Sequence, residues 1–457
     1  MDGLLSGSES TARKWLYPVI RKGPFYKWRS WLSYFYLVFF FTGPLIRING
    51  QPLLLLNFID RQFVLLGQVF WPEDIFLFVI ASLVFIVCVV LFTIAFGRIF
   101  CGWICPQTIF MEMVFRKIEV WIEGNANKRK KLDAGPWNKE KIFKKTAKTI
   151  IFILVSFLIS NTFLAYIIGS DALIKIAVEP ITSHWVGFIS IWVFTIVFYV
   201  VYSRIREQVC TLFCPYGRLQ GVMIDEHTLV VAYDDVRGEP RGKLDRKNLS
   251  DAPKGDCVDC GLCVDVCPTG IDIRRGTQLE CINCTACIDV CNEVMDKIHK
   301  PRKLIGFFSE NMIHEKEKPS FTGRMMAYSA VIAVLTGVLC YFVFSRTDMD
   351  ITVMRSAGFL YQEQPGGNIS NIYNAEIINK TNQDKVLTLR AEDPSVKIKY
   401  IQAPGKVIHG SSVKTVFFII MKASAIHKLK TEVRLQLISD SKVAETVETT
   451  FVGPLNN

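Results

Sequence analysis

Long apolar runs alternate with polar and basic segments over the first three quarters of the chain. Five of these runs are long enough to cross a bilayer as a helix, which takes about 20 residues. They are Trp28–Ile46, Ile75–Phe96, Thr149–Gly169, Trp185–Ser203 and Met325–Ser345. The pattern therefore predicts an α-helical transmembrane bundle of about five spans.

A further apolar segment, Pro52–Phe70, is interrupted by Asp60 and Arg61. Charged side chains are costly within a membrane span. We therefore expect a re-entrant or surface-lying piece here and not a sixth span.

The last hundred or so residues have a different pattern, in which short runs rich in Val, Ile, Thr and Tyr are bounded by Gly, Pro, Asn and Asp. This pattern is typical of β-strands. The runs are Asn371–Ile378, Lys385–Leu389, Val396–Ile401, Lys414–Met421, Thr431–Ile438 and Val443–Phe451. Roughly six or seven strands in this length predict an all-β sandwich of immunoglobulin-like type. The region contains no cysteine and no catalytic motif, so we expect a protein-contact or spacer role.

The composition agrees with a membrane protein. Half of the 457 residues are hydrophobic, and the mean hydropathy is positive. Fourteen cysteines in a chain of this length do not indicate a secreted disulfide scaffold. All but Cys88 and Cys340 fall in paired motifs, and these two are expected to act as small apolar residues.

Charge gives the spans an orientation. Basic residues are concentrated before the first span, between the second and third, and after the fourth. They include Arg21, Lys22, Lys27, Arg29, Lys128, Arg129, Lys130, Lys131, Lys139, Lys141, Lys144, Lys145, Lys148, Arg204, Arg206 and Arg218. By the positive-inside rule these segments are cytoplasmic, and an odd number of spans puts residues after Arg346 in the periplasm. The net charge of +11 then reflects topology and contact with anionic lipid, and nucleic acid is not an expected partner.

Eight cysteines follow one spacing twice, C-x2-C-x2-C-x3-C, with the copies 24 residues apart. This is the bacterial ferredoxin run that holds two 4Fe–4S clusters. The fourth cysteine of each run binds the other cluster. The first cluster is thus expected on Cys257, Cys260, Cys263 and Cys291, and the second on Cys281, Cys284, Cys287 and Cys267.

Two other interpretations of these runs are a pair of zinc sites and a disulfide framework. A zinc site needs two C-x2-C pairs and has no use for a third cysteine two residues further on. The spacing therefore favours one-electron transfer by iron–sulfur clusters.

A second repeat lies at the membrane face. Cys101-Gly-Trp-Ile-Cys105-Pro106 follows the second span, and Cys210-Thr-Leu-Phe-Cys214-Pro215 follows the fourth. Each C-x3-C-P motif precedes an amphipathic stretch, which is Gln107–Glu123 in the first copy. The first four spans therefore resemble two copies of a helix pair plus a turn, and a pseudo-two-fold axis could bring the four sulfurs together.

Four thiols at this place have several interpretations. Soft thiolates bind Cu(I), and a dithiol can also be redox-active. The alternative is that these cysteines only pack as small apolar residues. The sequence does not choose the ligand, but the recurrence of the motif favours a functional, copper-binding or redox, site.

The chain has no G-x-G-x-x-G after a predicted strand, no Walker A sequence and no C-x-x-C-H. We therefore expect no nicotinamide, flavin, nucleotide or covalent haem site. Electrons must then come from another molecule, which is either a quinol or a soluble reductant.

These features predict a multidomain membrane protein: transmembrane bundle, dicluster ferredoxin α+β module and β-sandwich. The expected domains are an N-terminal cytoplasmic segment, a four-span domain with both CxxxCP motifs, a cytoplasmic ferredoxin-type domain, a fifth transmembrane helix and a periplasmic sandwich. Their ranges are 1–27, 28–220, 221–320, 321–346 and 347–457.

This combination resembles the cytochrome c oxidase accessory protein family called FixG, CcoG or RdxA. The resemblance covers essentially the whole chain, and the CGWICPQ and CTLFCPYGRLQ segments carry it most specifically. Membrane ferredoxins of the NapH and NosR type share the CxxxCP and dicluster elements but lack this C-terminal domain.

The resemblance implies a metal-ion reductase of the bacterial inner membrane that reduces Cu(II) to Cu(I) for assembly of cbb-type cytochrome c oxidase. Oxidase subunits or copper chaperones are the implied partners. Copper reduction is then expected at Cys101, Cys105, Cys210 and Cys214. Two alternatives remain open, a quinol-linked conduit of the NapH/NosR type that feeds another reductase and a non-enzymatic oxidase assembly scaffold.

Overall fold

The structure is a computed structural model of the 457-residue chain. It describes residues 15–48, 50–58, 62–65, 67–70, 74–180, 182, 184–243, 255–345, 347, 349–356, 358, 360–381, 383–426, 428–439 and 442–454. The chain folds as two compact units. The first comprises Met1–Thr42, Ile80–Ala165 and Ser170–Thr336, and the second comprises Gly43–Val79, Tyr166–Gly169 and Gly337–Asn457.

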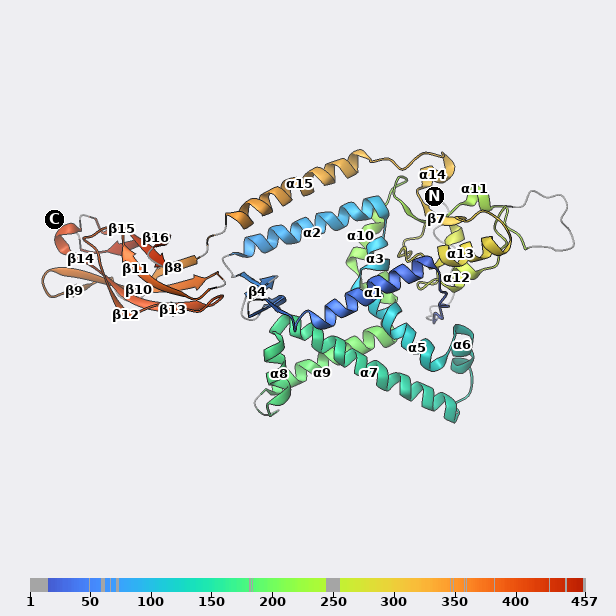
Figure 1. The fold of residues 1–457 in the computed structure, drawn as a ribbon, viewed down its shortest axis with the longest axis horizontal. Coiled ribbons are helices and arrows are strands. Elements are labelled where there is room, and N and C mark those ends of the chain that lie inside the picture. The colour runs from blue at the N-terminus through green and yellow to red at the C-terminus, as the bar shows by residue number, and fades with distance from the viewer. Residues whose placement is uncertain are drawn as a thin grey trace. The chain divides into compact units, whose positions relative to one another are not determined.

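Helices dominate the membrane region (Figure 1). The helices before the ferredoxin module are α1 (Pro24–Thr42), α2 (Ile75–Phe96), α3 (Ile99–Trp103), α4 (Pro106–Thr108), the π-helical η2 (Ile109–Phe115), α5 (Arg116–Glu123), α6 (Ala126–Ala134), α7 (Lys139–Ile168), α8 (Ser170–Val178), α9 (Trp185–Val200), the π-helical η3 (Val201–Ile205) and η4 (Val209–Phe213), and α10 (Pro215–Met223). Helix α15 (Gly323–Phe344) follows the module.

Four helical segments in the described part of the chain are long and apolar enough to cross a membrane. They are Ile75–Phe96, Lys139–Ile168, Trp185–Ile205 and Gly323–Phe344. Each contains or closely matches a predicted span, and the chain is a multipass membrane protein. The first predicted span, Trp28–Ile46, corresponds to α1. This helix ends at Thr42, four residues before the predicted end, and is not one of the four. The odd number of spans, and the orientation that depends on it, stay predictions.

The segment Pro52–Phe70 forms strands and no helix. Strands β3 (Leu54–Asn57), β4 (Gln62–Leu65) and β5 (Gln68–Phe70) pair antiparallel around buried Leu55, Val64 and Val69. A small sheet thus stands where we expected a re-entrant or surface-lying piece, and the described residues of this segment form no sixth span. Asp60 and Arg61, which motivated that expectation, lie outside the described residues. The two-residue strands β1 (Arg47–Ile48) and β2 (Gln51–Pro52) pair nearby.

The ferredoxin module is built between two paired strands, β6 (Val230–Tyr233) and β7 (Ile305–Phe308). Between them lie α11 (Asp235–Gly238), α12 (Leu262–Asp265), the 3-10 turn η5 (Ile273–Arg275) and α13 (Ala286–Lys297), and α14 (Glu310–His314) follows. Helices α12 and α13, one from each cysteine run, lie side by side (Figure 1). Their shared core includes Val231, Ile273, Ile288 and Met295.

The C-terminal region is a sandwich of two antiparallel sheets. One has the order β12-β14-β10-β8 with β9 paired to β10, and the other has the order β13-β11-β15-β16. The strands are β8 (Met349–Arg355), β9 (Gln362–Gln364), β10 (Asn368–Asn379), β11 (Lys385–Ala391), β12 (Lys397–Gln402), β13 (Gly405–Val407), β14 (Ser412–Lys422), β15 (Lys430–Ser439) and β16 (Lys442–Val452). All six predicted strands are present.

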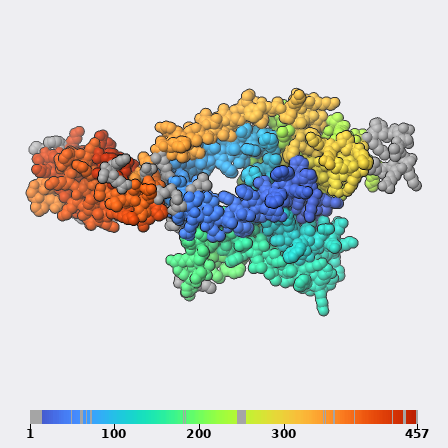
Figure 2. All heavy atoms as spheres, viewed as in Figure 1, coloured from blue at the N-terminus to red at the C-terminus, as the bar shows by residue number. Residues whose placement is uncertain are grey.

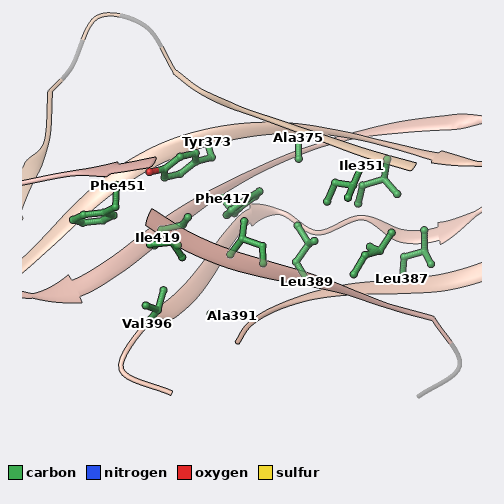
Figure 3. Packing of buried hydrophobic residues seen from close by; sticks show 14 of the residues in the cluster. Ile351, Tyr373, Ala375, Leu387, Leu389, Ala391, Val396, Phe417, Ile419 and Phe451 are labelled. Atoms are coloured by element: carbon green, nitrogen blue, oxygen red, sulfur yellow. The ribbon is translucent and has the colours of Figure 1, made fainter. Parts of the chain in front are cut away.

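The sandwich holds together through one apolar core without cysteine. Tyr373 stacks on Phe417 between the sheets, with ring centroids 5.9 Å apart. Phe451 and Leu389 come from the opposite sheet, and Figure 3 shows these side chains directed into the same layer. In the space-filling view the orange and red residues of the sandwich form a dense body (Figure 2). This region supplies a folded unit with its own core.

Candidate functional site

The two CxxxCP segments adopt the same turn. In the first, the N–H of Cys105 donates to the carbonyl of Phe100, and in the second the N–H of Cys214 donates to that of Val209. Each second cysteine is the N-cap of a helix whose first residue is the following proline, α4 in one copy and α10 in the other. Proline is favoured there because it has no N–H to leave unpaired. The repeat seen in sequence is therefore also a repeat of backbone geometry.

The four CxxxCP sulfurs are electrostatic neighbours. Burial raises the pKa of Cys210 to about 12, and the charges of Cys105, Cys101 and Cys214 add to this shift. Burial also raises the pKa of Cys101 and Cys105. A thiol in such a place is a weak acid when alone, and a soft metal ion would hold it deprotonated.

An internal ion network ties the two turns together. Glu119, on α5 after the first turn, accepts from both terminal nitrogens of Arg206, just before the second. Arg129 and Lys148 also donate to this carboxylate. Burial would raise the pKa of Glu119, but the charges of Arg206, Lys148 and Arg129 outweigh it and hold the value at about 2. Arg206 and Arg129, which the sequence assigned to topology, are thus buried structural cations.

The two ferredoxin runs repeat in backbone as well. Asp259 and Asn283, one repeat apart, both have positive φ, 47° and 51°. Gly261 and Thr285, the next equivalent pair, also have positive φ, 71° and 65°. A left-handed residue is uncommon outside glycine and asparagine, so the loops share a specific fold. That loop lets closely spaced thiols point toward one centre.

Two cavities lie inside the module. The first is lined by Cys257, Cys260, Cys263 and Cys291 among apolar residues such as Val290 and Leu304. The second is lined by Cys267, Cys281, Cys284 and Cys287, and Cys263 also borders it. Each set of four cysteines that we assigned to a cluster lines one hollow, and the assignment itself stays a prediction.

The donor sets fit iron–sulfur clusters better than single ions. Within the described ranges, no three Cys, His, Asp or Glu side chains lie close enough together to hold one metal ion. In a 4Fe–4S cluster the ligand cysteines bind different irons, so they stand further apart than ligands of one ion. Four thiols around each hollow suit that requirement. The CxxxCP sulfurs are neighbours but do not form a ready-made single-ion site.

The first CxxxCP turn packs directly on the second ferredoxin run. A Cβ added to Gly102, between Cys101 and Cys105, would lie 2.3 Å from the carbonyl oxygen of Ile282 and 3.1 Å from Cα of Cys284. The indole N–H of Trp103 donates to the carbonyl of Asn283 at 3.2 Å. Glycine is thus the residue that permits this contact, and it joins one candidate site to the other.

Asn283 stabilises this contact through side-chain hydrogen bonds. Its side chain is 2 % exposed. Its Oδ1 accepts from the N–H of Val231 at 3.2 Å, and its Nδ2 donates to the carbonyl of Phe96, the last residue of α2, at 3.1 Å. One side chain therefore connects the second run, strand β6 and a membrane helix.

Arg98 lies between the same elements and is 4 % exposed. Its Nε donates to Oε1 of Gln220, on α10, at 2.6 Å. Its Nη1 donates to the carbonyl of Leu279, two residues before Cys281. Gln220 also accepts from the thiol of Cys101 at 3.5 Å. Arg98 thus contacts the second CxxxCP helix and the second ferredoxin run from a position beside the first CxxxCP turn.

A helix N-terminus is docked on the second run. The carboxylate of Asp289, on α13, accepts from the backbone N–H groups of Phe25 and Tyr26 in the first turn of α1, at 3.2 and 2.8 Å. Burial raises the pKa of Asp289, and these two bonds oppose the shift. A carboxylate at this end of a helix also meets the positive end of its dipole.

Sequence reasoning found the twelve motif cysteines but not the residues that join them. Arg98, Gln220 and Asn283 have no spacing signature, because each acts on partners more than a hundred residues away or on another element. One signal was present: Arg98 is a lone charge between an apolar span and a CxxxCP motif. A charge at such a place is a candidate for a buried polar role.

Three family matches cover the same regions. Residues 78–129, with the first CxxxCP motif, match a family described as a 4Fe-4S binding domain. Residues 205–310, with the second motif and both cysteine runs, match a 4Fe-4S dicluster domain. Residues 339–454 match the family described as the IG-like fold at the C-terminus of FixG, putative oxidoreductase.

Whole-chain relatives carry the same names. The chain is 35 % identical over 385 residues to Protein RdxB of Cereibacter sphaeroides, covering 80 % of each chain. It is 33 % identical over 392 residues to Protein RdxA of the same organism, covering 82 % of each. It is 31 % identical over 420 residues to Nitrogen fixation protein FixG of Rhizobium meliloti, covering 83 % of this chain and 79 % of that one.

Proposed function

The chain belongs to the family of FixG and RdxA and is an iron–sulfur electron-transfer protein, and we propose that it is a cupric reductase of the bacterial inner membrane. Electrons enter at the ferredoxin module, which faces the cytoplasm, and reach Cu(II) at the four CxxxCP cysteines. Cys257, Cys260, Cys263 and Cys291 would hold the first cluster, and Cys281, Cys284, Cys287 and Cys267 would hold the second. The Cu(I) serves assembly of a cbb-type cytochrome c oxidase, and the sandwich domain is periplasmic.

The observation that carries this proposal is the packing of Gly102 on the backbone of Ile282–Cys284. It puts the first CxxxCP turn in van der Waals contact with the run assigned to the second cluster. No intervening domain or side chain separates them at that point. An electron that reaches the second run is therefore next to the turn that carries Cys101 and Cys105.

Thiolate chemistry supplies the driving force. Sulfur ligands prefer Cu(I) to Cu(II), so copper bound at Cys101, Cys105, Cys210 and Cys214 becomes easier to reduce. Each Cu(II) needs one electron to become Cu(I), and the 4Fe–4S clusters that the two runs would hold supply one-electron transfer. Copper is the substrate here and is released as Cu(I) to an oxidase subunit or a copper chaperone.

The test replaces one cysteine of each CxxxCP pair. We expect the Cys101→Ser/Cys210→Ser variant, purified without oxygen and reduced, to keep its iron content and lose Cu(II) reduction. Formation of Cu(I) is followed with a colorimetric Cu(I) chelator, and iron is measured on the same sample. The matched control is Cys88→Ser/Cys340→Ser, which removes two cysteines outside the motifs and should reduce copper at the normal rate.

An unchanged rate in the CxxxCP variant would exclude these cysteines from the reaction. Cluster reduction by quinol, without a response to copper, would then favour a conduit of the NapH/NosR type. A scaffold role has its own test, because the sandwich has an independent core. Deleting residues 347–457 should leave copper reduction intact, whereas a pure scaffold has no such reaction to keep.

A further inference from the structure

The strongest unassigned feature of the site is Arg98, a buried cation bonded to Gln220, which also contacts Cys101, and to the carbonyl of Leu279, two residues before Cys281. Its guanidinium donates to Gln220 Oε1 and to the Leu279 carbonyl, and both acceptors are neutral. Among the described residues, no carboxylate forms an ion pair with Arg98. A guanidinium stays protonated in a protein, so its positive charge is not cancelled locally.

Arg274 offers the comparison within the same module. It lines the first cavity beside Cys257, Cys260 and Cys263. Unlike Arg98, it pairs with two carboxylates, those of Asp272, at 2.8 Å, and of Asp259. The first cavity therefore has an arginine whose charge is more than balanced, whereas the second run has one whose charge is not.

This difference acts on reduction. A cluster gains negative charge when it accepts an electron, and its potential depends on the net charge, hydrogen bonds and solvent exposure around it. An uncompensated cation stabilises the reduced form, and it does so more strongly in a buried place of low effective dielectric constant. Paired carboxylates beside the first cavity oppose reduction there.

We propose that Arg98 is a positioning residue that raises the reduction potential of the second cluster above that of the first, so that electrons run toward the CxxxCP cysteines. One electron leaves the first cluster, which is oxidised, and enters the second, which is reduced, with no proton or bond change. Arg98 sets this direction through its charge and fixes the geometry through Gln220 and Leu279. The inference rests on the proposed path but not on copper as the final acceptor.

The exposure of the cysteines fits this direction. Cys260, in the first run, is exposed, whereas each of the four cysteines of the second run is only partly exposed. A soluble or quinol donor can thus approach the first run more closely, and the cation lies at the other end of the module. Burial of the second run by itself would disfavour a reduced, more negative cluster. A fixed positive charge at that place offsets the penalty.

The experiment is a reductive titration of the full-length protein with both clusters loaded and no copper, followed by EPR. Two reduction steps are expected. Arg98→Gln should move the higher-potential step to lower potential and leave the other in place. A shift that changes the electron distribution tenfold equals about 59 mV for a one-electron couple. Arg98→Lys should retain most of the wild-type potential, because it keeps the charge.

Two further variants separate charge from folding. Gln220→Glu keeps Arg98 and supplies a carboxylate partner, so it should lower the same step as Arg98→Gln. Arg274→Gln is the matched control and should lower only the lower-potential step, since it leaves Asp272 and Asp259 unbalanced.

The proposal is overturned if Arg98→Gln moves neither step, moves only the lower one, or shifts both equally, or if Gln220→Glu has no effect. Because copper is absent, these results are independent of Cu(II) reduction. A protein that orders its clusters in this way but does not reduce copper would retain the inference and lose the proposed substrate.

Discussion

The two cysteine runs share a spacing and a loop conformation but have opposite surroundings. At the equivalent positions, Asp259 carries a side chain that is 44 % exposed, whereas Asn283 is 2 % exposed and bonded to a membrane helix. Local sequence determines the loop, and the long-range partners determine what the loop is used for. One run faces outward, where a donor can approach, and the other is packed against the CxxxCP turn.

The largest expected effect comes from replacing each of these equivalent residues with alanine. Asn283→Ala leaves the buried N–H of Val231 and the carbonyl of Phe96 without their side-chain partner, and each loss costs about 1–3 kcal/mol. Asp259→Ala is made at the equivalent positive-φ position, but the carboxylate is 44 % exposed, so loss of its ion pair with Arg274 should cost no more than about 1 kcal/mol. Hydrogen exchange of peptides 281–291 and 257–267 in the full chain measures both. Equal effects would mean that the two runs do not differ as described.

A second, smaller effect is expected at the contact between turn and run. Gly102→Ala places a Cβ against the carbonyl of Ile282 and should destabilise the docked run by about 1–3 kcal/mol, the usual cost of overpacking. Faster exchange in 281–291 reports this change. Gly337→Ala, on α15, is the control, because nothing lies within 4 Å of the added atom. If both variants give the same exchange rate in 281–291, the close approach at Gly102 does not contribute to the stability of the docked run.

The difference in exposure also predicts the order in which iron is lost. A chelator under air should remove iron from the first run about tenfold faster than from the second, which corresponds to ~1.4 kcal/mol in local protection. Cys260 is exposed, whereas Cys284 lies beneath the first CxxxCP turn. Alkylation of the freed thiols, read by mass spectrometry on each run, assigns the phases. Simultaneous labelling of both runs would contradict the comparison.

The smallest expected effect is an opposite response to pH. Burial raises the pKa of Asp289 above its ordinary value of 3.8. The contribution of Asp289 to stability is therefore fully present below pH 3.8, and it is lost as the pH rises through the higher pKa of the folded state. The Arg274 bond lowers the pKa of Asp272, so its contribution is present above 3.8 and is lost as pH falls through the lower folded pKa.

Between pH 7 and pH 4, acidification should therefore slightly strengthen the attachment of α1 to the second run and leave the first run unchanged. Hydrogen exchange of α1 peptides measures this change. The matched variant Asp289→Asn should remove the pH dependence. If acidification instead weakened the attachment of α1, the predicted direction of the pH effect would be wrong.

Most of the fold could be predicted because hydrophobic periodicity is local. The apolar run Ile75–Phe96 has the same bounds as α2, and the alternation at Asn371–Ile378 lies within β10. The segment Pro52–Phe70 was harder, since a short apolar run suits a strand or a buried helix equally well. Short strands such as β13 (Gly405–Val407) were missed because three residues show no period.

The candidate site divides in the same way. Spacing identifies the cysteines, since ligands of one cluster lie close together in sequence. It does not identify Arg98 or Gln220, which are 122 residues apart, because their pairing depends on how the start of α3 packs on α10. Nor does it tell a basic residue on the surface from one such as Arg206, which is buried against Glu119.

The Asp289 carboxylate at the start of α1 has a consequence for biosynthesis. It accepts from Phe25, 264 positions earlier in the chain. During translation the first helix emerges long before this partner exists, so its first turn has exposed N–H groups until the second cysteine run has been made. Contacts over such a separation close late. We therefore expect the N-terminal helix to dock on α13 in one of the last steps of folding, together with completion of the iron–sulfur module.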